Sequence, residues 1–271
     1  ETIFNLNFSS GDGSTLGDLS SNGHNFAIQG NASWSTDVPE VTTTATNTHS
    51  LSFDGVDDDV DISLNNGDSF LNNSPGTIAF WFKMYDTSSD NPPLVVSHEY
   101  PGNNFFQFKL DYAEQKLVFL LRDDSWGAAK ILNSIDVLEY NTWQFVSGTV
   151  DEDSIKYYIN GVLQDSEANS GAYDFISSSN RILFAHSYRI AGGTFTNTFL
   201  DEVSIWSVAL TQSEIQNNMS TSLSGNETGL VGYWNFNEGS GTTLTDLTSN
   251  GNDGTIYGAT WSTDVDRKST R

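Results

Sequence analysis

The chain has no cysteine, so no disulfide bond can hold its fold together. Its 271 residues are enough for one β-sandwich to bury roughly three quarters of the surface of the unfolded chain, so the core needs neither a disulfide nor a metal ion. The lack of cysteine fits a secreted bacterial protein or a cytosolic one. It argues against the disulfide-rich extracellular modules of animals.

Basic residues are scarce. Lysine and arginine together number 11, against 35 aspartates and glutamates, and the formal net charge is −24. This field repels nucleic acids and anionic membranes, so it argues against nucleic-acid recognition. Solubility, calcium binding through carboxylates, or both together explain such a charge.

Long apolar runs are also lacking. The longest fall far short of the roughly 20 residues that span a bilayer, so no membrane insertion is expected. No signal peptide is recognisable after Glu1, where strand-like sequence follows at once. We therefore expect a mature or excised piece of a larger protein.

Short runs rich in Val, Ile, Phe, Tyr and Thr alternate with clusters of Gly, Asn, Asp and Ser, which predicts short antiparallel strands joined by tight turns. The clearest strands are 77–83, 105–110, 117–122, 144–150 and 155–159. Asn160-Gly161 predicts a type I′ hairpin, because both central residues of that turn need a positive φ. One helix is expected over 211–219, where Thr211 and Glu214 can form a capping box.

An internal repeat joins the two ends of the chain. Residues 13–38 (GSTLGDLSSNGHNFAIQGNASWSTDV) correspond to 241–265 (GTTLTDLTSNGNDGTIYGATWSTDV), and FNLNF at 4–8 corresponds to GYWNF at 232–236. An isolated pair of strands is marginal in water. We therefore expect both copies in one sandwich and a single domain over 1–271, with the C-terminal repeat 229–265 packed as part of it. Trp34 and Trp261 are expected to anchor a shared core.

Four further segments carry a resemblance to a known family. They are LSFDGVDDDVDI at 51–62, GTIAFWFK at 76–83, NTWQFVSGTVDEDSIKYYINGVL at 141–163 and FLDEVSIWSVALTQSEI at 199–215. In order and spacing the chain resembles the laminin-G-like, or concanavalin A-like, jelly-roll domains of secreted bacterial proteins. The resemblance implies an all-β fold, an antiparallel two-sheet β-sandwich (jelly roll) with one short helix near 211–219. It also implies secretion or cell-surface display as part of a larger bacterial protein.

The resemblance further implies a structural calcium ion near the chain ends, shared with Asp201. The two D-L-x-S-N-G turns place Asp18 with Asn22, and Asp246 with Asn250, on compact loops that offer the hard oxygen ligands calcium requires. The alternative is that these side chains only form Asx-turns.

Other acidic and amide residues are also candidates for calcium. Ser9 stands where related domains often carry Asp, which makes the C-terminal copy, with Asn237, Glu238 and Asp253, an equal candidate. The remaining acidic cluster consists of Asp54, Asp57, Asp58 and Asp59. Carboxylates so close together repel one another unless a cation or solvent screens them.

Aromatic and polar side chains mix on the central segments, as sugar-binding surfaces require. The candidate ligand contacts are His98, Lys109, Arg122, Trp126, His186, Tyr188 and Arg189. For Trp126, stacking on a ligand and covering the core are equal alternatives. If the basic residues converge, they favour a sulfated or carboxylated polysaccharide; otherwise each is a solvated charge at a strand edge.

The remaining aromatic residues on regular strands are expected in the core. They are Phe80, Trp81, Phe82, Trp143, Phe145 and Trp206.

The predicted function is non-catalytic carbohydrate binding of a lectin-like or adhesive kind. The Glu-x-Asp-x-x-Glu pattern of jelly-roll glucanases, which sets two carboxylates on one face of a strand, is not found in the sequence. Two alternatives stay open, because this fold hosts lectins, enzymes and spacers alike. One is a polysaccharide lyase or glycoside hydrolase of jelly-roll type, and the other is a structural or adhesive spacer without a glycan ligand.

Overall fold

The computed structural model describes residues 6–7, 15–18, 26–27, 47–63, 75–85, 93–97, 105–111, 114–122, 129–134, 138–169, 181–187 and 194–265. Residue contacts divide the chain into two units, Glu1–Thr43 and Thr44–Arg271, and each is described by itself. The prediction of one domain over 1–271 therefore stays a prediction. Trp34 lies outside the described residues.

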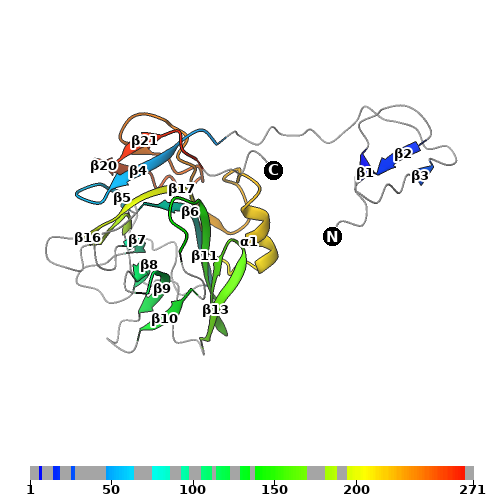
Figure 1. The fold of residues 1–271 in the computed structure, drawn as a ribbon, viewed down its shortest axis with the longest axis horizontal. Helices are drawn as coiled ribbons and strands as arrows, with labels where there is room; N and C mark the ends of the chain where they lie inside the picture. The colour runs from blue at the N-terminus through cyan, green and yellow to red at the C-terminus, as the bar shows by residue number, and fades with distance from the viewer. Residues whose placement is uncertain are drawn as a thin grey trace. The chain divides into compact units, whose positions relative to one another are not determined.

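The larger unit is an antiparallel β-sandwich, which confirms the predicted fold class (Figure 1). The β8 sheet has the strand order β10 (Lys130–Asn133), β9 (Lys116–Arg122), β8 (Phe105–Asp111), β7 (Pro93–Ser97), β14 (Arg181–Phe184), β5 (Asp59–Ser63), β20 (Gly254–Tyr257), β19 (Thr243–Leu244). The β6 sheet has the order β13 (Val162–Ala168), β12 (Ser154–Ile159), β11 (Gln144–Val150), β6 (Gly76–Met84), β17 (Asn197–Trp206), β4 (Ser50–Asp54), β21 (Thr260–Ser262), with β18 (Leu230–Trp234) also paired to β17.

The remaining described strands form two smaller sheets. β15 (His186–Ser187) pairs with β16 (Thr194–Phe195) in the larger unit. In the smaller unit, β1 (Leu6–Asn7), β2 (Thr15–Asp18) and β3 (Phe26–Ala27) form a three-stranded sheet in that order.

Alternation along the strands directs one face of each sheet into a shared core. On β6, Phe80 and Phe82 are almost fully buried, and on β8 Phe106 and Phe108 are fully buried. The rings of Phe80 and Phe108 meet edge to face across the two sheets, with centroids 5.3 Å apart. Alternate residues of both strands thus face the core.

The helix and the hairpin turn predicted from the sequence are both present. Helix α1 (Gln212–Asn218) has Thr211 as its N-cap, and Thr211 and Glu214 form the capping box. Ile215 of α1 packs into a second apolar cluster on the outer face of the β6 sheet. Asn160 and Gly161 have φ values of 49° and 71°, as the type I′ turn requires.

The C-terminal repeat is part of the sandwich. Its strands pair at three places, β18 with β17, β20 with β5 and β21 with β4. Trp234, Phe236, Leu244 and Ile256 from this repeat lie in the main core, at most 4% exposed, and Trp261 packs against it. The repeat therefore closes both sheets at one end (Figure 1).

None of the helices within the described residues is long and apolar enough to cross a membrane.

At Gly148 the backbone of β11 lies close to side chains of the opposite sheet. A Cβ atom built on it would lie 2.7 Å from ring atoms of Phe119 and 2.8 Å from Phe108. These rings are themselves stacked, with centroids 4.5 Å apart. The position therefore has no room for a methyl group.

We predict that Gly148→Ala lowers the free energy of unfolding by about 1–3 kcal/mol, because the added methyl overpacks the core. Urea unfolding followed by circular dichroism measures the change. The control is Val162→Thr on β13, whose side chain is 56% exposed. It should shift the free energy of unfolding by no more than about 0.5 kcal/mol. A Gly148→Ala variant as stable as the parent would contradict this account of the sheet spacing.

Candidate functional site

A cavity of about 770 Å³ opens on the outer face of the β6 sheet, beside the end of α1. We call it the tryptophan groove. Its lining comes from β6, the segment before β11, the β12–β13 turn, α1 and the chain after β21. The lining residues are Trp81, Lys83, Asn141, Thr142, Trp143, Asn160, Gln216, Met219, Ser220, Asp264 and Val265.

Strand β6 supplies the floor of the groove because its side chains alternate. Phe80 and Phe82 point into the core, so Trp81 and Lys83 lie on the opposite, outer face. Trp81 is half-buried, and its ring lies 5.3 Å from that of Phe145. Its Nε1 atom is buried without a hydrogen-bond partner, so the floor of the groove contains an indole donor that the described residues leave unused.

Lys83 is a buried cation within an aromatic cage. It is only 7% exposed, and its Nζ atom lies 4.8 Å from the ring centroid of Phe199 and 5.7 Å from those of Tyr85 and Trp143. Asp264 compensates the charge: one of its oxygens pairs with Lys83 Nζ, and the other accepts a hydrogen bond of 3.0 Å from Trp143 Nε1. The charges of the described lining residues therefore balance.

Amide and hydroxyl groups form the rim. Asn141 and Asn160 both have a positive φ, which Asn tolerates better than most residues, and this conformation sets them on tight turns at the mouth. Asn160 is fixed by a 2.9 Å bond from Phe145 N to its Oδ1, and Gln216 donates to Gly161 O at 3.0 Å. Aromatic faces beside neutral polar groups suit the apolar faces and hydroxyl groups of a sugar.

Within the part of the chain that the structure describes, Asp264 is the one carboxylate that lines the groove, and it is paired with Lys83. Glycoside hydrolysis in its usual form needs two carboxyl groups about 5–10 Å apart across the bond that is cleaved. The lining of this groove offers binding groups in place of such a pair.

The predicted ligand contacts belong to the other side of the molecule where the structure describes them. Lys109 is half-buried on β8, and Arg122 ends β9, where its Cα partner is Phe105. His98, Trp126, Tyr188 and Arg189 lie outside the described residues. Their role in ligand binding stays a prediction. Of the predicted contacts whose side chains the structure describes, Lys109 and His186 do not line the tryptophan groove.

His186 is buried rather than displayed. Its exposed fraction is 3%, its Nδ1 lies 2.6 Å from Asp59 Oδ2, and its ring stacks on Phe195 at 4.2 Å. The ring joins β5 to the β15–β16 pair, so it offers little surface to a ligand, and its predicted contact role stays a prediction.

Two residues of the groove were predicted for the core, and neither is fully buried, although Trp81 packs against the second apolar cluster. Trp81 and Trp143 are half-buried and line the groove. For Trp81 the alternation with Phe80 and Phe82 was the available signal, because three consecutive aromatics on one strand cannot all face the same side. Phe80, Phe82, Phe145 and Trp206 are buried as predicted.

Asp246, a predicted calcium ligand, fastens the turn in which it lies. Its Oδ1 accepts from Tyr233 N at 3.1 Å and Thr248 N at 2.9 Å. Its Oδ2 accepts from Thr248 Oγ1 at 2.9 Å and Asn252 N at 3.0 Å. The Asx-turn alternative thus accounts for this carboxylate. Asn250 in the same turn is exposed and donates to Val231 O at 2.8 Å.

Asp201 lies near polar residues from two other segments of the chain, one at 47–48 and one at 237–245. It is fully buried on β17, and Asn47 Nδ2 donates to its Oδ2 at 2.7 Å. The next residue, Thr48, donates to Asn237 Oδ1 at 2.7 Å, which places Glu238 beside this segment. Glu238 Oε1 accepts from Thr245 N at 2.8 Å, while its Oε2 is buried without a hydrogen-bond partner.

Of the other predicted ligands, Asp18 lies on β2, whose side chains are outside the described set, and Asn22 is also outside it. Within the described residues the structure brings Asp201 together with Asn47. The calcium ion that Asp201 was predicted to share with Asp18 stays a prediction.

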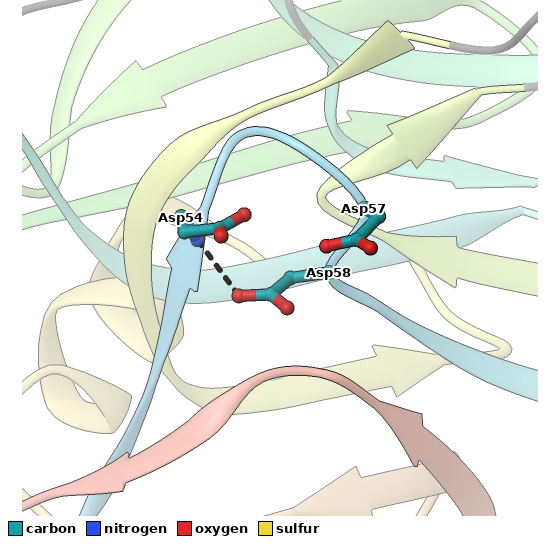
Figure 2. Close-up of side chains that lie close together, drawn as sticks. All are labelled: Asp54, Asp57 and Asp58. Carbon is teal, nitrogen blue, oxygen red and sulfur yellow. Dashed lines mark hydrogen bonds between the residues drawn. The ribbon is translucent and has the colours of Figure 1, made fainter.

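The acidic cluster of the sequence lies at the turn between β4 and β5 (Figure 2). Oxygens of Asp54, Asp57 and Asp58 lie within 4.8 Å of one another. Asp58 Oδ2 accepts from Asp54 N at 2.9 Å, and Asp54 Oδ1 accepts from Val56 N at 2.7 Å, so two of the three shape the turn. Burial raises the pKa of Asp58, the hydrogen bond from Asp54 N lowers it, and the neighbouring carboxylates raise it again.

Comparison with known families agrees with the fold and the order of the motifs. The Laminin_G_3 model, described as the concanavalin A-like lectin/glucanases superfamily, matches residues 53–216, more than half of the chain. The chain belongs to this superfamily. No curated protein sequence matches the chain.

Solved structures show the same fold at low sequence identity. A protein from Bacteroides ovatus that is assigned a carbohydrate-binding role is 19% identical, with a TM-score of 0.62, over 80% of this chain and 60% of that one. The chain thus spans about three fifths of that protein's length. Two other solved structures are similar too weakly to carry an argument. A pentraxin from Limulus polyphemus is 14% identical, with a TM-score of 0.48, over 64% of this chain and 82% of that one. The receptor-binding domain of botulinum neurotoxin D is 20% identical, with a TM-score of 0.49, over 79% of this chain and 51% of that one.

We predict that Asp246→Ala lowers the free energy of unfolding by at least about 2 kcal/mol, because four hydrogen bonds to a carboxylate are lost together. Asn250→Ala, which removes one exposed bond from the same turn, should cost less than about 1 kcal/mol. Urea unfolding of both variants measures the difference. Equal effects of the two substitutions would show that Asp246 does not fasten the turn.

Proposed function

We propose that the chain is a non-catalytic carbohydrate-binding module that holds its glycan in the tryptophan groove. The observation that carries the proposal is the pairing of two half-buried indoles, Trp81 and Trp143, with a rim of amide and hydroxyl groups in one 770 Å³ cavity. Membership of the concanavalin A-like lectin/glucanases superfamily supports a carbohydrate ligand. The carbohydrate-binding role assigned to the protein from Bacteroides ovatus agrees with this choice.

The groove favours a neutral polysaccharide. Among the described lining residues Lys83 is the one basic side chain, and Asp264 already compensates it. The formal charge of −24 on the whole chain repels acidic polymers. The sulfated or carboxylated ligand predicted from the basic residues would need the other face of the molecule, where Lys109 and Arg122 lie on β8 and β9.

We predict that Trp143→Ala weakens glycan binding at least tenfold, since truncating a central aromatic contact removes more than about 1.4 kcal/mol. The glycan is chosen as the strongest signal on an array of neutral and acidic polysaccharides, and calorimetry gives Kd for parent and variant. Trp143→Phe keeps an aromatic face and should retain part of the affinity.

Trp126→Ala is the comparison variant, because Trp126 belongs to the contact set predicted from the sequence. Unchanged binding in Trp126→Ala with loss in Trp143→Ala supports the groove. The reverse result contradicts it and favours the contact set predicted from the sequence.

Incubation with the same glycans distinguishes the two alternatives. Release of reducing ends or of unsaturated uronates would overturn the non-catalytic assignment in favour of a hydrolase or a lyase. No binding on the array at any polysaccharide would favour a structural or adhesive spacer.

The proposal includes one structural calcium ion near Asp201. The donor set fits, because Asn47, Asp201 and Glu238 supply amide and carboxylate oxygens, the hard ligands of calcium. A buried carboxylate oxygen without a partner, as at Glu238 Oε2, destabilises the fold unless a cation or water compensates it. At the acidic turn, by contrast, Asp54 and Asp58 accept hydrogen bonds from backbone N–H groups.

We predict that a chelator lowers Tm by about 5–10 °C, because an ion present at 100 times its Kd adds about 2.7 kcal/mol to the stability. Scanning calorimetry with and without added calcium measures the shift. The shift should vanish in Glu238→Gln and persist in Asp57→Asn. A Tm that ignores both calcium and chelator contradicts the site, and a shift lost in Asp57→Asn alone moves it to the turn after β4.

Secretion or display on the surface of a bacterium, within a larger protein, completes the proposal. The scarcity of basic residues and the absence of cysteine are compatible with that setting.

A further inference from the structure

The two repeats form the same hairpin. The Cα partners are Thr15↔Ala27 and Leu16↔Phe26 in β2–β3, and Thr243↔Thr255 and Leu244↔Gly254 in β19–β20. Aligning the repeats through DLSSNG and DLTSNG sets each position of the first hairpin on its counterpart in the second. The register is identical, so each repeat has the local structure of a unit that closes a sandwich.

In the larger unit the C-terminal repeat occupies the place beside β4 and β5. The repeat covers β5 with β20, and β4 with β21. It also fills the core there with Trp234, Phe236 and Leu244, none of them exposed. A second unit of the same kind would have to displace this one to pair with β4 and β5.

The residue at position 254 determines which repeat can pair with β5. A Cβ atom on Gly254 would lie 2.8 Å from Val60 Cγ1 and 3.2 Å from Ile62 Cγ1, so β5 leaves no space for a side chain there. The N-terminal repeat has Phe26 at this position. A phenyl ring at that point would push β20 away from β5.

Two further differences act in the same direction. Trp234 donates from Nε1 to Asn252 O at 3.0 Å and meets Phe184 edge to face, whereas the N-terminal repeat has Leu6 in its place. Glu238, which accepts from Thr245 N, is replaced by Ser10. The N-terminal repeat therefore lacks contacts that hold the C-terminal repeat in the sandwich.

We propose that the N-terminal repeat, residues 4–38, is the closing unit of a second sandwich of the same kind. In that partner, the strand in the place of β5 carries small side chains where Val60 and Ile62 stand here, which leaves room for Phe26. The partner would also bind the N-terminal repeat through backbone hydrogen bonds, because an edge strand pairs with an added hairpin through its free N–H and C=O groups. This inference is independent of the proposed glycan.

Introduced cysteines can report which repeat lies beside β4, because the full chain has none of its own. Ser52 on β4 has Thr260 as its Cα partner, and Ser33 is the counterpart of Thr260 in the N-terminal repeat. One variant therefore carries Ser52→Cys with Thr260→Cys, and the matched variant carries Ser52→Cys with Ser33→Cys. Both are oxidised at low concentration, and the disulfides are mapped by mass spectrometry.

We expect the 52–260 disulfide to form at least ten times more than the 52–33 disulfide in the otherwise unchanged chain. Exchanging the deciding residues, Phe26→Gly together with Gly254→Phe, should raise the 52–33 disulfide at least tenfold. Val60→Ala with Ile62→Ala, which imitates the proposed partner, should raise it as well and serves as the second test if the exchange variant does not fold.

Three results would overturn the proposal. Equal yields of the two disulfides in the unchanged chain would mean that both repeats share this sandwich. An unchanged yield of the 52–33 disulfide in both the exchange variant and the Val60→Ala, Ile62→Ala variant would mean that Phe26 does not keep the N-terminal repeat from pairing with β5. A 52–33 disulfide between two chains would make a second copy the partner.

Discussion

The structure depends on the strict alternation of side chains along β6, which lies between β11 and β17 in the middle of its sheet. Phe80 and Phe82 face inward and meet the rings of the opposite sheet, and this contact holds the two layers together. The same alternation leaves Trp81 and Lys83 on the outer face, where the tryptophan groove lies. Opposite faces of β6 therefore line the core and the groove, so the packing of the core fixes the position of the groove floor.

A buried charge normally destabilises a protein unless it is paired. Lys83 meets this requirement through Asp264 and three aromatic rings, and Asp264 also orients Trp143. Asp264 comes from the C-terminal repeat, so the segment that closes the sandwich also completes the groove. We infer that the stability of the closing segment and the shape of the groove are linked.

Local sequence signals predicted the local structure well. The strand pattern, the capping box of Thr211 and the Asn160-Gly161 turn depend on residues close together in the chain, and the structure confirms each of them. The groove could not be predicted in the same way. It joins β6, the end of α1 and Asp264, which are far apart in the sequence, and its indoles were attributed to the core because aromatic residues on strands usually face inward.

The residues predicted or proposed as calcium ligands differ in the same way, because some depend on neighbours in the sequence and others on distant residues. The Asx-turn chemistry of Asp246 was visible in the sequence, whereas the neighbourhood of Asn47, Asp201 and Glu238 depends on how β17 and the closing segment meet. Of these, Asp201 was predicted as a ligand through family resemblance and Glu238 was a candidate in the C-terminal repeat, whereas Asn47 was not predicted. Local patterns indicated the turn of Asp246, but they could not indicate that Asn47, which is distant in the sequence, contacts Asp201.

The indole N–H signals in an NMR spectrum test the central claim most directly, because the chain has seven tryptophans and each gives its own signal. During titration with a bound oligosaccharide, the account predicts that the Nε1–H signals of Trp81 and Trp143 shift in a saturable way while those of the buried Trp206 and Trp234 stay in place. A saturable shift of Trp126 with Trp81 and Trp143 unchanged would contradict the account.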